Sequence, residues 1–473
     1  MVFLYCKDIY YLRTLILLKK AMEKVIKLRK GLDIKIEGSP DSSLNAPTVS
    51  YTRYALKPVD FYGMHPKLSV QAQDRVLAGE KLFYDKNDSR IFLTSPVSGT
   101  VSEIVIGPRR VIEEIRIEAD EQTQYKEFGT LDPLSASAEE IQQKLLQAGL
   151  WAFIRQRPYD LIAKPGERPR DIFISAFDTA PLAPDMDMIV RGQEEYFQAG
   201  VDALSKLTDG KVHIGVHRLK TASKAYLECR NAEIHAFEGP HPCGNVGVQI
   251  HHIAPINKGD VVWYVHPQDV IIMGRLFKRG VYDATKLVAV AGSEVLKTGY
   301  HKVLAGLNVG YLLEGNLKQG SEVRVISGNI LTGKRIAKDG YLGAFDHLVS
   351  VIPEGKRFRF MGWMTPGFNL YSYSRTFFSW LFPRRRYRID TNLNGSGRAF
   401  VLTGQFEKVL PMDIYPMQLL KACIAKDIEN MEALGIYEVS PEDFALCEYI
   451  DASKTEIQQI IRESLEFIRK EVQ

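Results

Sequence analysis

The sequence predicts a multidomain protein in which an all-β region, an α/β region, a smaller β-rich region and a helical tail follow one another. Three observations predict this class. The 473 residues exceed what one hydrophobic core usually serves, and about three domains are expected for this length. In the first two thirds of the chain, short apolar runs are bounded by glycine, asparagine and proline. Towards its end, apolar residues recur at helical spacing.

The composition fits a packed protein. Hydrophobic residues make up 45% of the chain and charged residues 25%, which is ordinary for folded domains. Lysine and arginine number 61 against 57 for aspartate and glutamate, a net charge of +4. Because nucleic-acid binders derive affinity from many phosphate contacts, we expect no nucleic-acid partner. The five cysteines are scattered without C-x-x-C spacing, which favours a reducing compartment.

The N-terminal 21 residues are the one candidate for a membrane span. Lys7, Asp8 and Arg13 interrupt their apolar run, whereas a span needs about twenty mostly apolar residues in sequence. A signal peptide would carry its positive charge before that run, not after it. We predict that residues 1–21 form an extension outside the fold and that Met22 is the true start. A peripheral helix that touches a membrane is the alternative.

From Val25 onwards the pattern is that of β structure. Residues 25–38 alternate apolar and charged side chains around Gly31, as a half-buried strand with a turn does. A Ser/Asn/Pro-rich loop follows over residues 39–48. Residues 70–107 then hold short strands separated by glycine and asparagine turns. These stretches predict one compact all-β unit.

An α/β region comes next. Ser137 and Glu140 form a capping box, and Gly149 ends the helix that they begin. The strands predicted after it are continuously apolar, as parallel strands covered on both faces are. They lie at residues 171–177, 212–216 and 260–265, with a helix over residues 193–207 between the first two.

The last third of the chain combines a β-rich region with helices. Residues 287–292 open a small β-rich domain of roughly seventy residues, a size typical of domain anatomy. A helix is predicted over residues 416–434. Ser440 and Pro441 open a second helix as N-cap and first residue. Ser453, with Glu456 three residues later, is predicted to cap a third.

Searches for catalytic motifs find none. The sequence lacks a Walker-type phosphate loop, a G-x-G-x-x-G after a strand, H-E-x-x-H and G-x-S-x-G. Residues 239–247 come nearest to a phosphate loop, but two prolines remove donors and no Lys-Ser/Thr follows. A tight structural loop is the alternative. We predict no catalytic residue.

Four of the ten histidines gather around this loop, close to Cys243. They are His235, His241, His251 and His252. A metal site needs three or four converging ligands, but neighbouring residues of a strand, as we take His251 and His252 to be, point to opposite faces. We predict no bound metal. A buried polar network and a ligand-facing loop remain open as interpretations.

Residues 368–388 hold the densest group of apolar side chains. Five of them fill six positions, and arginines follow Pro383. The residues are Phe377, Phe378, Trp380, Leu381, Phe382, Arg384, Arg385, Arg386 and Arg388. A core element is one interpretation, but four guanidinium groups cannot all be buried unpaired. Aromatic and basic side chains together are typical of a protein interface or a lipid headgroup region.

Several long stretches carry a family resemblance. They read VIKLRKGLDIKIEGSP, GEKLFYDKNDSRIFLTSPVSGTVSEI, GPHPCGNVGVQIHHIAPINKGDVVWYVHPQDVIIMGRLF and PGFNLYSYSRTFFSWLFPRRRY, followed by DTNLNGSGRAF and MDIYPMQLLKA. These stretches resemble the A subunit of the bacterial sodium-translocating NADH:quinone oxidoreductase. The likeness covers nearly everything after Met22.

The resemblance implies a domain order that matches the pattern derived from the residues. After the extension of residues 1–21 it implies a barrel-sandwich hybrid of the biotinyl/lipoyl type over 22–130, a Rossmann-like α/β domain over 131–284, a β-grasp domain of the soluble-ligand-binding type over 285–352, a connecting segment over 353–405 and a helical domain over 406–473.

The same resemblance implies a peripheral subunit on the cytoplasmic face of the bacterial inner membrane. Its partners would be the other five subunits of a sodium pump, especially the membrane-embedded ones. FAD, FMN, riboflavin and iron–sulfur centres in those subunits would carry electrons from NADH to quinone, the substrate. Residues 368–388 would then face the membrane-embedded subunits. Composition alone makes the Gly/His-rich loop around His241, Cys243 and His251 the candidate for a quinone contact, because a quinone site combines an apolar slot with a few polar groups.

A wider likeness, to the C subunit of the Rnf complex and the NADH-binding flavoprotein subunit of respiratory complex I, bears on cofactors. Those proteins hold clusters on cysteine-rich runs, but the corresponding stretch here, DFALCEYIDASKTE, has Cys447 alone. A [4Fe–4S] cluster needs four thiolates. We therefore expect no cofactor in this chain. A cofactor-free scaffold or regulatory module of another Rnf-like electron-transfer complex is the alternative function.

Overall fold

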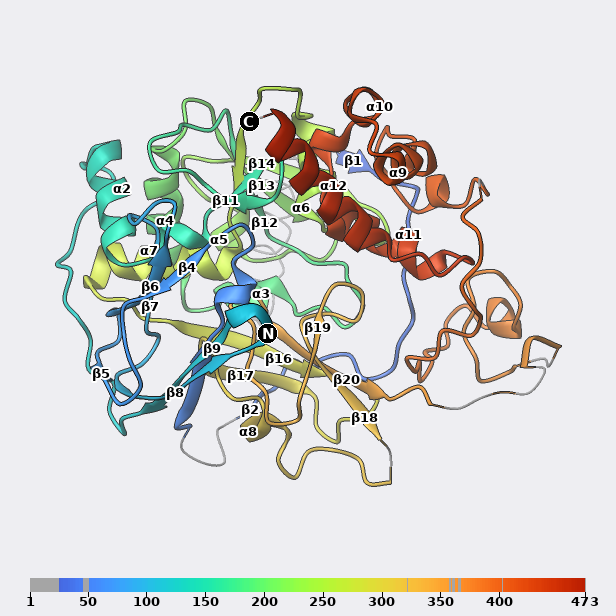
Figure 1. Cartoon of the computed structure of the whole chain (residues 1–473), viewed down its shortest axis with the longest axis horizontal. Coiled ribbons are helices and arrows are strands. Elements are labelled where there is room, and N and C mark those ends of the chain that lie inside the picture. The colour runs from blue at the N-terminus through green and yellow to red at the C-terminus, as the bar shows by residue number, and fades with distance from the viewer. Residues whose placement is uncertain are drawn as a thin grey trace, which may run out of the picture.

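A computed structural model describes most of the chain after Lys24. The described residues are 25–45, 51–320, 322–356, 359, 362–364, 367–401 and 403–472. The predicted extension of residues 1–21 and the predicted start at Met22 lie outside them. Within the described residues the protein combines four sheets with helices, and a separate group of helices at the C-terminus covers one side (Figure 1).

The central sheet has seven strands within this part of the chain. In spatial order they are β1 (Val25–Lys27), β14 (Glu233–Glu238), β13 (Val212–His217), β12 (Ile172–Ser175), β15 (Val262–Tyr264), β10 (Arg155–Arg157) and β11 (Leu161–Ile162). The first five run parallel, and β10 and β11 complete one edge antiparallel. The three strands predicted from continuous apolar runs are confirmed as the neighbours β13, β12 and β15.

Helices flank the central sheet. They are α2 (Ala138–Gln147), α3 (Met186–Val190), α4 (Glu194–Ser205), α5 (Lys224–Leu227), α6 (Val246–Ile253) and α7 (Pro267–Arg279). The predicted capping box begins α2, where the Ser137 hydroxyl accepts from Glu140 N and the Glu140 carboxylate accepts from Ser137 N. Helices α4 and α7 pack closely because Gly274 has no side chain. A Cβ atom at this position would lie 1.7 Å from Tyr196 O, which is too close for any other residue.

A six-stranded sheet forms the predicted β-rich region. Its strands, in spatial order, are β19 (Lys334–Ile336), β18 (Val323–Ser327), β20 (Leu348–Pro353), β16 (Thr285–Ala291), β17 (Gly299–Leu304) and β2 (Leu44–Asn45), with the short helix α8 (Gly310–Leu313) beside them.

Two smaller antiparallel sheets form the all-β unit. One contains β3 (Arg53–Leu56), β9 (Ile112–Ala119), β8 (Gly99–Ile106) and β5 (Arg75–Val76), and the other β4 (Pro66–Leu68), β6 (Lys81–Asp85) and β7 (Phe92–Thr94). Long β8 and β9 pair with two register irregularities.

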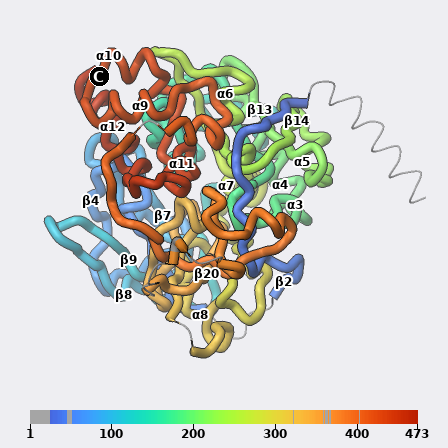
Figure 2. Tube along the Cα trace, turned by 90° about the vertical axis from the view of Figure 1, so that its right-hand side faces the viewer, coloured from blue at the N-terminus to red at the C-terminus, as the bar shows by residue number. Residues whose placement is uncertain are grey.

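The N-terminal strands differ from expectation. We expected residues 25–38 to belong to the all-β unit, but β1 pairs with β14 of the central sheet. We expected residues 39–48 to form a loop, but β2 within them pairs with β17 of the six-stranded sheet. Figure 2 shows this blue segment running along the outside of the molecule from one sheet to the other. Alternating polarity reports that one face of a strand is buried, and it carries no information about which sheet buries it.

The C-terminal helices are α9 (Pro416–Ala425), α10 (Ile428–Ala433), α11 (Ala445–Ile450) and α12 (Ile457–Val472). The single helix predicted over residues 416–434 is wrong, because Lys426 adopts a left-handed conformation and Asp427 caps a new helix by accepting from Asn430 N. The cap at Ser440 is confirmed, with Asp443 as its partner, and it opens the 3₁₀ helix η8 (Pro441–Phe444) that precedes α11. Ser453 does not cap α12, because its hydroxyl donates to Ala399 O.

The hydrophobic core is shared between units. One continuous buried cluster joins the all-β unit, the central sheet and the six-stranded sheet. A second cluster lies between the C-terminal helices and the other face of the central sheet, where Phe173 and Phe237 meet Leu419 and Ile461. The units are therefore packed against one another rather than strung on linkers.

Candidate functional site

The aromatic and basic segment carries a group of exposed side chains, here called the tip, made up of Phe378, Trp380, Leu381, Phe382, Arg384 and Arg385. A short 3₁₀ helix, η5 (Phe378–Leu381), presents Phe378, Trp380, Leu381 and Phe382 to solvent, and Trp380 is 51% exposed. Phe377 alone of the five apolar residues is buried. An unpartnered group of large apolar side chains on a surface marks an interaction site. The core-element interpretation is therefore wrong for four of the five residues.

Backbone pairing holds the base of this tip in place. Tyr387 is buried, its N–H donates to Lys35 O at 2.9 Å, and its carbonyl accepts from Glu37 N at 3.0 Å. Closer to the tip, the Ser372 hydroxyl accepts from Phe377 N at 2.9 Å. The exposed aromatic rings thus project from an anchored base.

The four arginines differ in their surroundings. Arg388 forms two bonds, of 2.6 and 2.8 Å, to the fully buried Glu294 carboxylate. Arg386 donates to Ile36 O and to the Ser39 hydroxyl. Arg385 donates to Phe368 O and Asn369 Oδ1, and both it and Arg384 are exposed. Arg386 and Arg388 bind residues outside the segment, Ile36 and Glu294, whereas Arg385 bonds only within it. Arg384 and Arg385 are therefore the cations best placed to meet a partner.

The Gly/His-rich loop is closely packed. His241 and Cys243 are buried, and His241 Nδ1 lies 3.1 Å from the Thr179 hydroxyl. Asp33, Pro240 and Thr179 accept from the backbone N–H groups of His241, Cys243 and Gly244 respectively. Since those donors face protein acceptors, the tight structural loop is the better interpretation and a phosphate cradle is not formed.

Burial also sets the protonation of this loop. It lowers the pKa of His241 to about 4, so the imidazole is neutral near pH 7. Burial, followed by Asp33, raises the pKa of Cys243 to about 12, so its thiol is protonated and is not an activated nucleophile.

His251 and His252 lie on α6, not on a strand as we expected. His251 Nδ1 lies 2.7 Å from Glu438 Oε2, and its other nitrogen accepts from Asp413 N at 2.9 Å. His252 Nε2 lies 2.7 Å from Pro411 O. The two rings fasten α6 to residues 411–413, which precede α9, and to Glu438, which lies between α10 and α11. His251 and His241 therefore have different partners.

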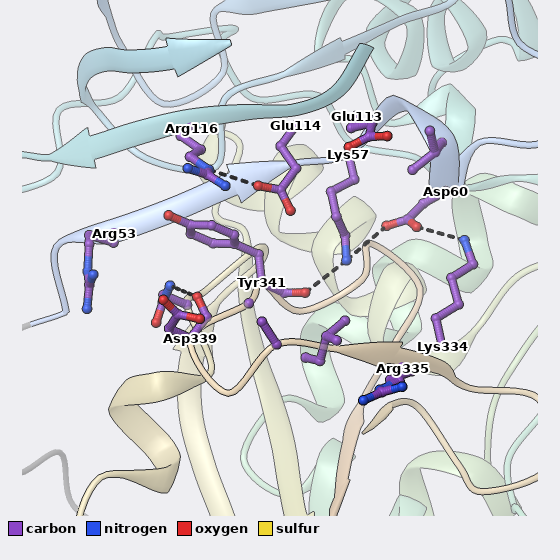
Figure 3. A pocket seen from close by; sticks show the side chains of 15 residues that line it. Arg53, Lys57, Asp60, Glu113, Glu114, Arg116, Lys334, Arg335, Asp339 and Tyr341 are labelled. Atoms are coloured by element: carbon purple, nitrogen blue, oxygen red, sulfur yellow. Dashed lines mark hydrogen bonds and ion pairs between the residues drawn. The ribbon is translucent and has the colours of Figure 1, made fainter. Parts of the chain in front are cut away.

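A charged cleft of about 460 Å³ separates the all-β unit from the six-stranded sheet. In Figure 3 side chains of both units line it, and two of the contacts drawn there cross from one unit to the other. Lys57 Nζ donates to Tyr341 O at 2.8 Å, and Lys334 Nζ donates to Asp60 Oδ1 at 3.0 Å. A quinone ring needs a mainly apolar slot, so this cleft suits an interface between two units better than a quinone site.

Within the described residues, two groups of histidine and carboxylate side chains come close enough to hold a metal ion. In the first, His266 and His347 stack with ring centroids 3.8 Å apart, and Lys286 Nζ lies 3.1 Å from Asp269 Oδ1. Stacked rings cannot both aim a lone pair at one ion, so this group does not form a metal site. The second group consists of His213 on β13 and of Glu233 and His235 on β14. Sequence reasoning missed it because His213 is far from the other two residues along the chain.

Within the described part of the chain, none of the helices combines the length and the apolar character needed to cross a bilayer.

Comparison with known families decides the relationship. Three family models match in order: "NqrA N-terminal barrel-sandwich hybrid domain" over residues 26–120, "NqrA second alpha/beta domain" over 136–282 and "NQRA C-terminal domain" over 287–338. The A subunit of the Na(+)-translocating NADH-quinone reductase from Yersinia pestis bv. Antiqua (strain Angola) is 38% identical over 453 residues, which cover 94% of this chain and 100% of the relative. The chain belongs to this family.

Other members of this A-subunit family agree. The Rhodopirellula baltica protein is 37% identical over 458 residues, covering 95% of this chain and 99% of its own length, and the Cellvibrio japonicus protein is 39% identical over 451 residues, covering 94% and 100%. The resemblance drawn from sequence stretches is confirmed, as is the barrel-sandwich hybrid. The Rossmann-like and β-grasp names and the predicted domain boundaries stay predictions.

Proposed function

We propose that this chain is the A subunit of a Na+-translocating NADH–quinone reductase and is a peripheral subunit on the cytoplasmic face of the membrane. The observation that carries the proposal is similarity to A-subunit proteins over their whole length. The lack of a membrane-crossing helix in the described part of the chain fits a peripheral position. Its partners are then the other five subunits of the pump.

This chain is proposed to hold no electron-carrying cofactor, so that electron transfer takes place in the other subunits. The four cysteines in the described part of the chain are free thiols. Cys447 lies in the stretch that corresponds to the cluster-binding run of related proteins, and it is fully buried. A [4Fe–4S] cluster needs four thiolates. FAD, FMN, riboflavin and the iron–sulfur centres therefore belong to the other subunits in this proposal.

The proposed docking surface for the membrane-embedded subunits is the set of exposed side chains of the tip: Phe378, Trp380, Leu381, Phe382, Arg384 and Arg385. Aromatic side chains are enriched in protein interfaces, and Arg384 and Arg385 suit the cytoplasmic side, where positive charge is favoured. Anionic headgroups would add about 1 kcal/mol for each basic residue close to the bilayer.

The quinone-proximal role of His241, Cys243 and His251 stays a prediction. Because the side chains of His241 and Cys243 are buried, a quinone could contact them only if the loop opened.

Co-expression with the five other subunits of a related pump tests the proposal. We expect this chain, when tagged, to purify with all five and to restore sodium-stimulated quinone reduction by NADH to a pump that lacks its own A subunit. The isolated chain should be colourless and contain neither flavin nor iron. Failure to assemble would contradict membership of the pump, whereas stoichiometric flavin or iron would contradict the cofactor assignment alone.

A further inference from the structure

Three side chains converge on one face of two parallel strands. In the register of β13 and β14, His213 lies opposite Glu233 and Gly215 lies opposite His235. Residues two apart on a strand share a face, so Glu233 and His235 both project beside His213. His213 Nδ1 is 2.9 Å from His235 Nε2 and 3.8 Å from Glu233 Oε2.

These separations suit a zinc ion. Zinc binds histidine nitrogen and carboxylate oxygen at about 2.0–2.2 Å in a tetrahedron, which places ligand atoms roughly 3.3 Å apart. The two measured separations lie on either side of that value, and all three ligand atoms are within 4.8 Å of one another. Small side-chain rotations therefore close the site without movement of the strands.

The ring of His213 is already oriented for this role. Its Nε2 lies 3.3 Å from Asp171 Oδ1, and the ring stacks on Phe173 with centroids 4.8 Å apart. Asp171 is itself held by Arg170 Nε at 3.0 Å and by Lys211 N at 3.2 Å. A histidine that donates one N–H to a carboxylate turns the lone pair of its other nitrogen towards a metal, as in many zinc sites.

The other two ligands leave the site open on one side. His213 is buried, His235 is half-buried and Glu233 is exposed. Lys211 bonds to Glu233 Oε1, while Oε2 of the same carboxylate faces His213.

We propose that His213, Glu233 and His235 bind one zinc ion, with the fourth position open to solvent. Two imidazoles and one carboxylate are a ligand set that zinc takes in proteins. Zinc does not change its oxidation state, so the site adds no electron carrier and does not depend on the proposed function. It revises the expectation from sequence that the chain binds no metal.

Calorimetric titration of the chelator-treated full chain with zinc chloride tests the site. We expect one zinc ion per chain and at least a tenfold loss of affinity in His213→Gln and in His235→Gln. Asp171→Asn should weaken binding about 10–100-fold, the usual effect of losing a partner of a ligand. His65→Gln is the matched control, because His65 is exposed and lies in the all-β unit.

Two further measurements keep the test decisive. Zinc should raise the melting temperature of the wild type and not that of His235→Gln, since a ligand that binds the folded state stabilises it. X-ray absorption should show nitrogen and oxygen ligands without sulfur. No zinc binding by the wild type, equal affinity in His235→Gln, or sulfur around the ion would overturn the proposal. If His213→Gln does not fold, the zinc affinity of His235→Gln alone decides the test, because His235 is less buried than His213 and its replacement disturbs the fold less.

Discussion

His241 is held neutral inside the protein, and this has a consequence for stability. Its ring is buried against the Thr179 hydroxyl, and burial lowers its pKa to about 4. In an unfolded chain histidine titrates at about 6.5. Between these two pKa values the unfolded chain binds more protons than the folded one. The stability of the folded state therefore falls as the pH drops through this range.

Removing His241 should flatten this pH dependence. Between pH 7.5 and pH 5 the histidine should cost the wild type about 2 kcal/mol of unfolding free energy, at about 1.4 kcal/mol per pKa unit. His241→Gln keeps a polar group near Thr179 and should lose less stability over the same interval. Urea unfolding at both pH values measures the difference. The exposed His65→Gln should keep the wild-type dependence, and identical slopes in all three proteins would show that His241 is not the cause.

Single residues also show where sequence reasoning stopped. The cluster of His235, His241, His251 and His252 was found from composition, but the fold sends its members to three different surroundings. The ligand group that does converge includes His213, which stands next to His235 only because β13 and β14 are paired. Strand order depends on long-range packing, so a local pattern does not reveal such a group.

At the scale of elements, local signals predict helix starts better than helix ends. Ser137 and Ser440 cap as predicted because their partners, Glu140 and Asp443, lie three residues away. The break at Lys426 was missed, since a left-handed lysine has no distinct sequence signal and the apolar pattern continues through it. Ser453 was misjudged because a distant carbonyl, that of Ala399, takes its hydroxyl.

The aromatic and basic segment was found from composition alone. The structure shows which of its side chains are exposed, so these can be replaced without disturbing the core. Trp380→Ser with Phe382→Ser, and separately Arg384→Glu with Arg385→Glu, should weaken co-purification with the membrane-embedded subunits. Both pairs are exposed, so the isolated chain should melt at the wild-type temperature. Arg386 is left unchanged because it donates to Ile36 O and anchors the base.

Leu219→Ser provides the matched control for the tip, because Leu219 is 74% exposed but lies in the loop after β13. This variant should assemble normally. If both tip variants also assemble and support quinone reduction at the wild-type rate, the docking surface lies elsewhere on the molecule.

At the scale of the whole molecule, buried charges join the C-terminal helices to the central sheet. Arg157 on β10 is fully buried, with Nη1 3.0 Å from Asp443 Oδ2 and Nη2 2.9 Å from Glu442 Oε1. Nearby, Arg462 of α12 donates to Asp160 Oδ2 at 2.7 Å. Although burial alone would raise the pKa of Asp160, Arg155, Arg462 and Arg157 hold it below its ordinary value. The order of the units could be predicted from sequence, but these contacts between residues about 300 positions apart could not.

Breaking this buried pair should loosen the C-terminal helices. Arg157→Met leaves the fully buried Asp443 carboxylate without its closest cation, and removal of one partner from such a pair costs about 3–5 kcal/mol. Replacing both residues, Arg157→Met with Asp443→Leu, should recover part of the loss because no unpaired buried charge remains. Recovery should be incomplete, since Asp443 also accepts from Ser440 N at 2.9 Å. Urea unfolding and hydrogen exchange along α12 measure both effects.

Arg75→Met is the control, because Arg75 pairs with Asp120 at the surface, where an ion pair contributes about 1 kcal/mol or less. We expect Arg157→Met to speed exchange in α9, α11 and α12 while β8 and β9 keep wild-type protection. Arg75→Met should change neither region. Equal losses of stability in Arg75→Met and Arg157→Met would mean that the C-terminal helices are held by the apolar cluster around Phe173 and Leu419 alone, and that the buried charges add no stability to that interface.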